Sequence, residues 1–173
     1  MKKVYMAILT LALVGVGTLN LKAQTYCASG ATSTIDTYIS NVTVGSVINQ
    51  TNTSCATYTD NTSAPGTLNP GYNYNVSVTS GDCNGGGVYN HGMEVYIDWN
   101  ADGDFTDPGE NVHSKGNSAA STESFVIVPP VSAAGTTVRM RAIVTEGGVS
   151  GPCGSYSWGE TEDYALDIVI PPG

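Results

Sequence analysis

The chain carries very little positive charge. Its 173 residues include 6 Lys and Arg against 15 Asp and Glu, which gives a formal net charge of −9. Half of the basic residues lie within the first 23 positions, so residues 24–173 carry three positive charges against fifteen negative ones, a formal charge of −12. Nucleic acids and anionic membrane surfaces are bound through clustered Lys and Arg. The composition therefore argues against both as partners.

Residues 24–173 also lack a helical period, an internal repeat and a long linker. Short segments instead alternate apolar and polar residues and are bounded by Gly, Pro, Asn or Ser, as strands are. In Thr137–Val144, for example, every second residue is apolar, and Arg139 and Arg141 point the other way. About eight such segments predict one all-β domain over residues 24–173, an antiparallel β-sandwich of jelly-roll or Ig-like type.

The N-terminal apolar stretch is too short to favour a membrane anchor. Lys2 and Lys3 precede the apolar run Val4–Leu19, and the small residue Ala23 closes the segment. This arrangement is typical of a secretory signal peptide. A membrane-spanning anchor is the alternative, but the run is interrupted by Thr and Gly. We therefore expect residues 1–23 to be removed, and the protein to be secreted or held at the cell surface without membrane insertion.

No Cys-x-x-Cys pair occurs, and both histidines are isolated, which argues against a cysteine-rich metal site. All four cysteines lie after residue 23. An even number of cysteines in an exported chain predicts two disulfides, for which three connectivities exist. We expect Cys27 to pair with Cys55, and Cys83 to pair with Cys153.

The acidic residues are concentrated in two short windows. Ten of the fifteen lie in residues 94–110 and 160–167. In the first window Asp98, Asn100 and Asp102 place oxygen atoms at alternate positions, and Gly103 permits a sharp turn. So dense a patch of carboxylates repels itself unless water screens it or a cation neutralises it. The pattern predicts a Ca²⁺ site; the alternative is a polar turn in which Asp and Asn cap a hairpin.

The first window alone holds too few ligands, because Ca²⁺ takes six to eight oxygens. It is not an EF-hand, since it follows a strand and the twelfth position from Asp98 is Gly109 rather than a Glu. We expect the backbone carbonyl of Asp104, together with Glu110 or an acid of the second window, to complete the shell. The predicted metal ligands are Asp98, Asn100, Asp102, Asp104, Glu110, Glu162 and Asp163.

The second window reads Gly-Glu-Thr-Glu-Asp-Tyr from residue 159. Strand alternation places Glu160 and Glu162 on the face of the apolar stripe that follows, where a carboxylate needs a partner. A metal ion and an arginine are both candidates, and Arg139 and Arg141 are the only arginines in the chain. We expect at least one of them to pair with Glu160, Glu162 or Asp163.

Several ordered motifs resemble those of the GEVED domain family. They are Tyr-Ile-Asp-Trp-Asn-x-Asp-Gly-Asp-Phe from residue 96, Arg-Met-Arg from 139, Pro-Cys-Gly from 152 and Gly-Glu-Thr-Glu-Asp-Tyr from 159. Thr161 replaces the Val of the family signature, and the opening pair Tyr26-Cys27 also matches the family pattern. The resemblance implies a secreted bacterial β-sandwich module, of a kind often attached to proteases and adhesins. It implies no particular activity.

The residues give little support for catalysis. His91 and His113 lie in loops beside no evident nucleophile, and the paired carboxylates favour a hydrolase only weakly. Tyr156 and Trp158 could together form an exposed platform for sugar rings, unless Trp158 packs into the core. We therefore predict a calcium-stabilised, non-catalytic binding or adhesion module whose partner is an extracellular protein or glycan. A carbohydrate-binding protein that uses the two aromatic residues is the chief alternative.

Overall fold

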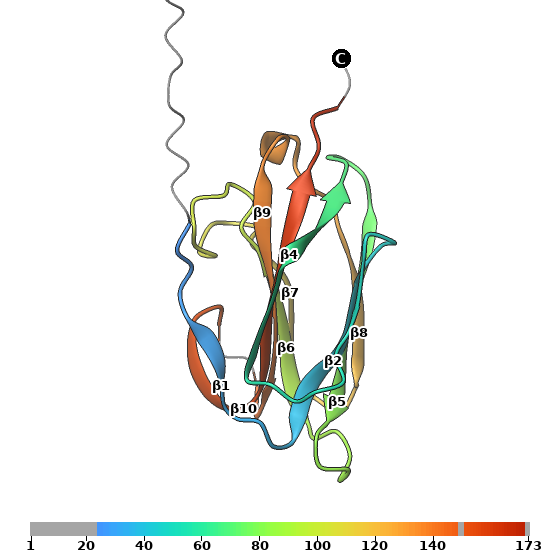
Figure 1. Cartoon of the computed structure of the whole chain (residues 1–173), viewed down its shortest axis with the longest axis vertical. Coiled ribbons are helices and arrows are strands. Elements are labelled where there is room, and N and C mark those ends of the chain that lie inside the picture. The colour runs from blue at the N-terminus through green and yellow to red at the C-terminus, as the bar shows by residue number, and fades with distance from the viewer. Residues whose placement is uncertain (1–23, 149–150, 172–173) are drawn as a thin grey trace, which may run out of the picture.

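The computed structural model describes residues 24–148 and 151–171, so the predicted signal peptide lies outside the described residues. Two β-sheets pack face to face (Figure 1). The first consists of β1 (Ser29–Ser33), β4 (Tyr58–Leu68), β6 (His91–Ile97), β7 (Asn111–Ser118), β9 (Thr137–Glu146) and β10 (Gly154–Ile168). The second consists of β2 (Thr37–Val44), β3 (Ile48–Thr51), β5 (Tyr74–Asp82) and β8 (Thr122–Ile127). A 3-10 turn, η1 (Val131–Ala133), precedes β9, and no helix of the described residues is long and apolar enough to cross a membrane.

Strand β10 organises the larger sheet. It is 15 residues long and pairs antiparallel with β9 along one edge. Along its other edge it pairs in parallel with β1 and then with β4. The smaller sheet has the order β3-β2-β5-β8, and all its pairs are antiparallel.

The predicted all-β sandwich is confirmed, but the described residues form ten strands instead of about eight and include two parallel pairs. Strands β1, β4 and β7 were missed because they are rich in polar residues and show little apolar alternation. Backbone pairing with β10 holds β1 and β4 in place, and pairing with β6 holds β7. A local pattern of side chains does not report such pairing.

The core lies between the two sheets and consists of the alternate side chains that the sequence predicts. In β6, Met93, Val95 and Ile97 are at most 1% exposed. The apolar residues of β9 and of the second half of β10 meet those of β2 and β5. Residues of this core include Ile39, Val42, Val76, Val78, Val138, Met140, Val144, Tyr164, Leu166 and Ile168.

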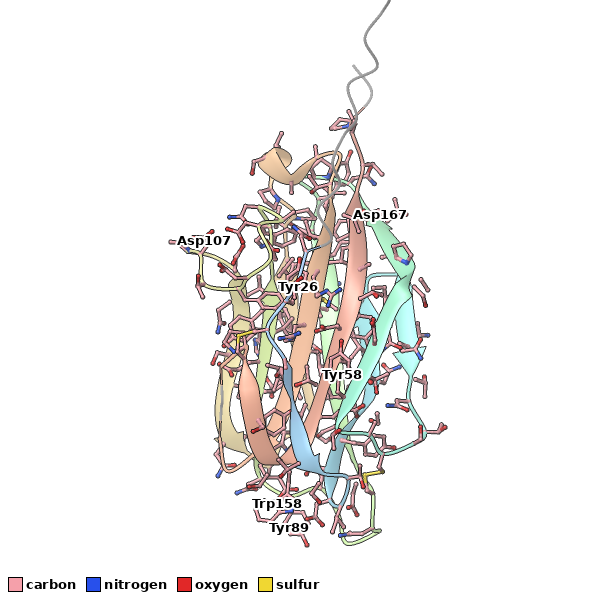
Figure 2. The ribbon with its side chains drawn as sticks, turned by 60° about the vertical axis from the view of Figure 1, so that its left-hand side comes forward. Tyr26, Tyr58, Tyr89, Asp107, Trp158 and Asp167 are labelled. Carbon is pink, nitrogen blue, oxygen red and sulfur yellow. A yellow bond between two sulfur atoms is a disulfide. The ribbon has the colours of Figure 1, made fainter. Side chains whose placement is uncertain are left out.

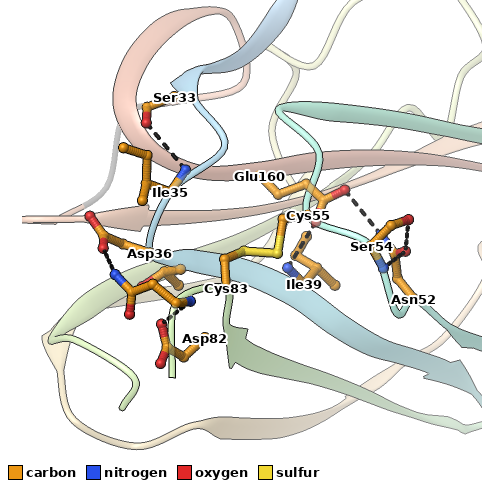
Figure 3. The surroundings of a disulfide bond; sticks show 12 residues. Ser33, Ile35, Asp36, Ile39, Asn52, Ser54, Cys55, Asp82, Cys83 and Glu160 are labelled. Atoms are coloured by element: carbon orange, nitrogen blue, oxygen red, sulfur yellow. Dashed lines mark hydrogen bonds between the residues drawn. A yellow bond between two sulfur atoms is a disulfide. The ribbon is translucent and has the colours of Figure 1, made fainter. Parts of the chain in front are cut away.

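The two disulfides are Cys27–Cys153 and Cys55–Cys83. The prediction of two disulfides is confirmed, whereas the expected pairing of Cys27 with Cys55 and of Cys83 with Cys153 is wrong. The parallel pairing of β1 with the beginning of β10 brings Cys27 beside Cys153, because each cysteine lies just before its strand. Cys55 precedes β4 and Cys83 follows β5, so their bond ties the two sheets together near one end (Figure 3).

Gly159 changes the side-chain alternation within β10. The Tyr156 and Thr161 hydroxyls lie 2.8 Å apart on one face, although five positions separate them and a regular strand would point them to opposite faces. Gly159 lies between them with φ +130°, a conformation that L side chains rarely adopt. The irregularity at this glycine therefore accounts for Tyr156 and Thr161 sharing one face.

We predict that Gly159→Ala destabilises the fold by about 2–4 kcal/mol, because it adds backbone strain and a steric clash. A Cβ atom at this position would lie 1.9 Å from the Val144 carbonyl oxygen. Gly116→Ala is the matched control, since a Cβ there meets nothing within 4 Å, and it should change stability by less than about 0.5 kcal/mol. Urea denaturation measures both, and equal midpoints for the two variants would contradict the prediction.

Candidate functional site

The acidic loop, residues 98–110, connects β6 to β7. Its two ends are held together, since the Ile97 amide donates to the Glu110 carbonyl at 2.8 Å and the Asp98 amide donates to the Arg139 carbonyl at 3.0 Å. The middle of the loop projects away from the sheets, with Asp107 on its outer side (Figure 2). As the sequence predicts, β6 delivers Asp98 to its C-terminal end.

Asp98 is fully buried beneath this loop, with 0% exposure. Its carboxylate accepts hydrogen bonds from the Tyr26 hydroxyl (2.7 Å) and from the backbone amides of Asp102 (3.2 Å) and Gly103 (2.9 Å). Burial and the bond to Asp98 raise the pKa of Tyr26, so Tyr26 remains a neutral donor. Asp98 is therefore the fixed point around which the loop turns.

The other polar side chains of the loop cap successive turns. Asn100 Oδ1 accepts from the Asp102 amide (3.1 Å), Asp102 Oδ1 from the Asp104 amide (3.2 Å), and Asp104 Oδ1 from the Thr106 amide (2.8 Å). These are Asx turns, the arrangement expected of the polar-turn alternative. They leave the second oxygen of Asp102 facing the middle of the loop, where the Asn100 amide donates to Asp102 Oδ2 (3.0 Å) and to Asp107 Oδ2 (2.5 Å).

In the described part of the chain, no group of three or more His, Cys, Asp or Glu side chains converges closely enough to hold a metal ion. In the acidic loop the amide nitrogen of Asn100 lies between two carboxylates. Two carboxylates of the loop, those of Asp102 and Asp107, therefore accept hydrogen bonds from one side-chain amide. Asp107, which was absent from the predicted ligand set, is one of them.

Glu110 closes the loop and is 2% exposed. Its Oε2 accepts from the Asp107 amide at 3.2 Å, whereas its Oε1 is buried without a hydrogen-bond partner. Burial, with a smaller contribution from the charges of Asp98, Asp107 and Asp102, raises the pKa of Glu110 to about 7. A buried carboxylate oxygen without a donor is unfavourable.

The second acidic window divides between the two faces of the larger sheet. Asp163 points to the outer face, whereas Glu160 and Glu162 point into the sandwich. The loop residue Asp98 lies on the outer face with Asp163, and Tyr26 lies near both. Glu162 is on the opposite face from Asp98, so the structure does not bring this predicted ligand to the loop.

Asp163 pairs with both arginines, which confirms the predicted ion pair. Arg141 binds its carboxylate with two nitrogens, Nε to Oδ1 at 2.7 Å and Nη2 to Oδ2 at 2.8 Å. Arg139 donates to Oδ2 at 3.1 Å, and the Tyr58 hydroxyl donates to the same oxygen at 3.1 Å. Arg141 is 2% exposed and Asp163 0% exposed, so this is a buried, saturated ion pair.

Glu160 and Glu162 take uncharged partners in the described residues, so the arginine, which was one of the two candidates, is the partner of neither. Glu160 accepts from the Thr59 hydroxyl (2.6 Å) and the Ile39 amide (3.0 Å). Glu162 accepts from the Tyr164 hydroxyl, and the Asn52 amide donates to both glutamates at 3.3 Å. Burial raises the pKa of each glutamate to about 7.

An N-terminal strap, residues 24–28, runs over the outer face of the larger sheet (Figure 2). Tyr26 lies between the Arg139 guanidinium, 4.3 Å from its ring centre, and the ring of Phe105, 5.2 Å away. Arg141 packs over Phe105 at 5.0 Å and donates to the Cys27 carbonyl at 2.9 Å. The sequence analysis missed this strap, and its only signal was the Tyr26-Cys27 pair of the resemblance.

The predicted aromatic platform is not formed. Tyr156 packs against the buried cluster that contains Tyr96 and Phe105, so it presents no open ring beside Trp158. Trp158 itself is 45% exposed. Figure 2 shows it near the same end of the sandwich as Tyr89, which is 50% exposed.

We predict that Asp163→Asn costs about 3–5 kcal/mol of stability, since it leaves two guanidinium groups without their buried carboxylate. The matched control is Asp167→Asn in the same strand, because Asp167 accepts only the exposed hydrogen bond of Thr137. The control should cost less than about 1 kcal/mol. Chemical denaturation gives both values, and a loss in Asp163→Asn no larger than in the control would refute the assigned role.

Comparison with solved structures finds likenesses that include two structures of one domain. The crystal structure of the CARDB domain of a Pyrococcus furiosus protein in complex with di-metal ions has 15% sequence identity and a TM-score of 0.39, over 87% of this chain and 97% of that chain. The solution NMR structure of that domain has 18% identity and a TM-score of 0.35, over 62% of this chain and 89% of that chain. No curated protein matches the chain significantly.

The family model of the GEVED domain matches residues 92–167. The match extends from β6 to β10 and contains the acidic loop, both arginines and the second acidic window. The motifs that resemble the family lie in these segments. The same segments supply the acidic loop and the Asp163–arginine pair on the outer face of the larger sheet. Residues 92–167 of this chain therefore match the GEVED domain family.

Proposed function

We propose that the protein is a non-catalytic binding module that works outside the cell, and that a Ca²⁺ ion in the acidic loop stabilises it. The observation that carries the proposal is how the buried carboxylates of the described residues are satisfied. Each has protein donors on both oxygens, with Glu110 as the exception. Buried acids with such partners hold strands together and are unavailable to a substrate.

The environment of the histidines supports a non-catalytic role. The expectation that both histidines lie in loops was wrong, since His91 begins β6 and His113 lies in β7. His91 lies 3.1 Å from the Ser80 hydroxyl, but both residues are buried, and the other ring nitrogen of His91 faces the Tyr89 carbonyl instead of a carboxylate. His113 stacks on Phe125 at 4.4 Å. The hollows on either side of Tyr26 are lined by neither Glu160 nor Glu162. A hydrolase would need an accessible nucleophile or carboxylate pair, as in known triads and glycosidases.

An extracellular location is supported by the disulfides and by the charge of the chain. Both bonds join segments that are far apart in sequence, and disulfides of this kind persist in oxidising compartments. A strongly acidic chain remains soluble there without binding anionic surfaces. The predicted signal peptide supports the same location.

The Ca²⁺ proposal rests on Glu110. Its Oε1 is buried without a hydrogen-bond donor. The negative charges of Asp98, Asp102 and Asp107 repel that of Glu110 and contribute to its raised pKa. A hard cation among these groups would supply the missing partner and remove the mutual repulsion. The proposed ligands are Asp98, Asn100, Asp102, Glu110 and the Asp104 carbonyl, as the sequence predicts, with Asp107 in addition.

Two details of the ligand set follow from the contacts. Turning the Asn100 amide by half a turn would present its oxygen where its nitrogen now faces Asp102 and Asp107, and would give up the hydrogen bond from the Asp102 amide to Asn100 Oδ1. Glu162 and Asp163 are omitted from the proposed set. Glu162 is on the other face of the sheet, and the two arginines already neutralise the charge of Asp163, whereas the donors to Asp98 are uncharged.

We expect added Ca²⁺ to raise the melting temperature and a chelator to lower it. At a hundredfold excess over the dissociation constant, binding contributes about 2.7 kcal/mol, which corresponds to a shift of roughly 5–10 °C. Glu110→Gln combined with Asp102→Asn should abolish the shift. The control, Asp82→Asn, changes an acid of the other sheet and should keep it. Unchanged melting of the wild type with chelator, and no heat of binding in calorimetry, would reduce the loop to a polar turn.

Glycans are the second candidate partner, favoured by the exposed ring of Trp158. Sugar rings stack on exposed aromatic side chains, which have a large apolar face. We expect a glycan bound at this end of the sandwich to quench the fluorescence of Trp158 and to lose its affinity in Trp158→Ala. Tyr72→Ala, which removes a ring that is 67% exposed elsewhere, should bind normally. A glycan array on which wild type and Trp158→Ala behave alike would leave a protein as the partner.

A further inference from the structure

The N-terminal strap contacts the acidic loop at three points. The Tyr26 hydroxyl donates to Asp98 Oδ2 at 2.7 Å. The Gln24 side-chain amide donates to the Ala101 carbonyl, and the Tyr26 ring packs on Phe105 at 5.2 Å. Ala101 has φ +57°, an uncommon conformation for a residue other than Gly. The strap therefore supports the loop where its backbone is least regular, and it fixes the most buried of its carboxylates.

The strap depends on the Cys27–Cys153 disulfide for its position. Residues 24–28 precede β1 and belong to no strand, and Cys27 is their covalent link to the segment before β10. Around this link, Arg141 donates to the carbonyls of Cys27 (2.9 Å) and Pro152 (2.7 Å). The disulfide thus holds Tyr26, the adjacent residue, over the outer face of the sheet.

We propose that the strap forms part of the cation site, with Tyr26 as a positioning residue for Asp98, so that full Ca²⁺ affinity requires the Cys27–Cys153 disulfide. This inference rests on the proposed Ca²⁺ site. Tyr26 holds one oxygen of Asp98 by a hydrogen bond, and partners of this kind set the orientation of a ligating carboxylate. When the strap is released, Asp98 loses that hydrogen bond, and Phe105 loses its contact with the Tyr26 ring. The ion-competent loop is then a smaller fraction of the population, which weakens the apparent affinity.

The consequence is that the loop takes up Ca²⁺ fully only after oxidative folding. A reduced chain, with Cys27 and Cys153 as thiols, keeps every proposed ligand but lacks the fixed strap. Disulfide formation and cation binding would then be coupled steps of maturation, and the complete site would form in an oxidising, calcium-containing environment. The Cys55–Cys83 disulfide has no such role, because it lies next to Glu160 and Asn52 rather than the acidic loop (Figure 3).

Calorimetric titration of the purified protein with Ca²⁺ tests the coupling. We expect Tyr26→Phe to weaken binding about tenfold, and Cys27→Ser/Cys153→Ser to weaken it at least as much. Tyr58→Phe removes a hydroxyl that serves Asp163 instead of Asp98, and Cys55→Ser/Cys83→Ser removes the other disulfide; both controls should bind as the wild type does. Adding Tyr26→Phe to Cys27→Ser/Cys153→Ser should cause little further loss, since both changes break the same contact.

Titrations are made at a temperature at which circular dichroism shows every chelator-treated variant to be folded, so that a loss of affinity is not a loss of fold. Wild-type affinity in Tyr26→Phe and Cys27→Ser/Cys153→Ser would overturn this inference and leave the Ca²⁺ site standing. Equal weakening by the two disulfide variants would also overturn it, because the effect would then be general. If the wild type binds no Ca²⁺, the proposed cation site fails and the inference fails with it.

Discussion

A buried carboxylate, Asp163, determines how the outer face of the larger sheet is built. Three side chains converge on it: the guanidinium groups of Arg139 and Arg141 and the hydroxyl of Tyr58. Removing these charges from water is expensive, and only close, multiple hydrogen bonds compensate for that cost. Because Arg141 must be covered to remain buried, the aromatic rings and the strap above it become necessary parts of the structure.

Strand β10 carries charge on both faces and still occupies the middle of a sandwich. The inward face buries Glu160 and Glu162 among hydroxyl and amide donors, and the outward face buries Asp163 among cations. Burial on the inward face raises the pKa of each of the two glutamates to about 7. Regular strand alternation directs these groups to opposite faces. The glycine before them, Gly159, lies where the steric environment tolerates no side chain.

These constraints explain how the most distinctive residues of the chain contribute to its architecture. The signature segment from residue 159 supplies the buried carboxylate that pairs with the arginines. Tyr26 lies between this ion pair and the acidic loop, where its hydroxyl binds Asp98. A module of this design can present loops and strand ends to a partner while its interior stays fixed. That is the behaviour expected of a binding domain carried on a rigid scaffold.

Local patterns were enough to predict the all-β class, the apolar faces of β6, β9 and β10, the delivery of Asp98 to a turn and an arginine–carboxylate pair. The first three depend on neighbours within a few residues. The ion pair could be predicted because the chain has only two arginines and fifteen acidic residues. Local patterns could not predict the disulfide pairing, the strap, or the strands β1 and β4. These features depend on which distant segments β10 places beside one another. Cys27 and Cys153 are more than a hundred positions apart, and they meet only after β1 has paired with β10. The distance between such residues is set by strand pairing in three dimensions and not by their spacing in the sequence.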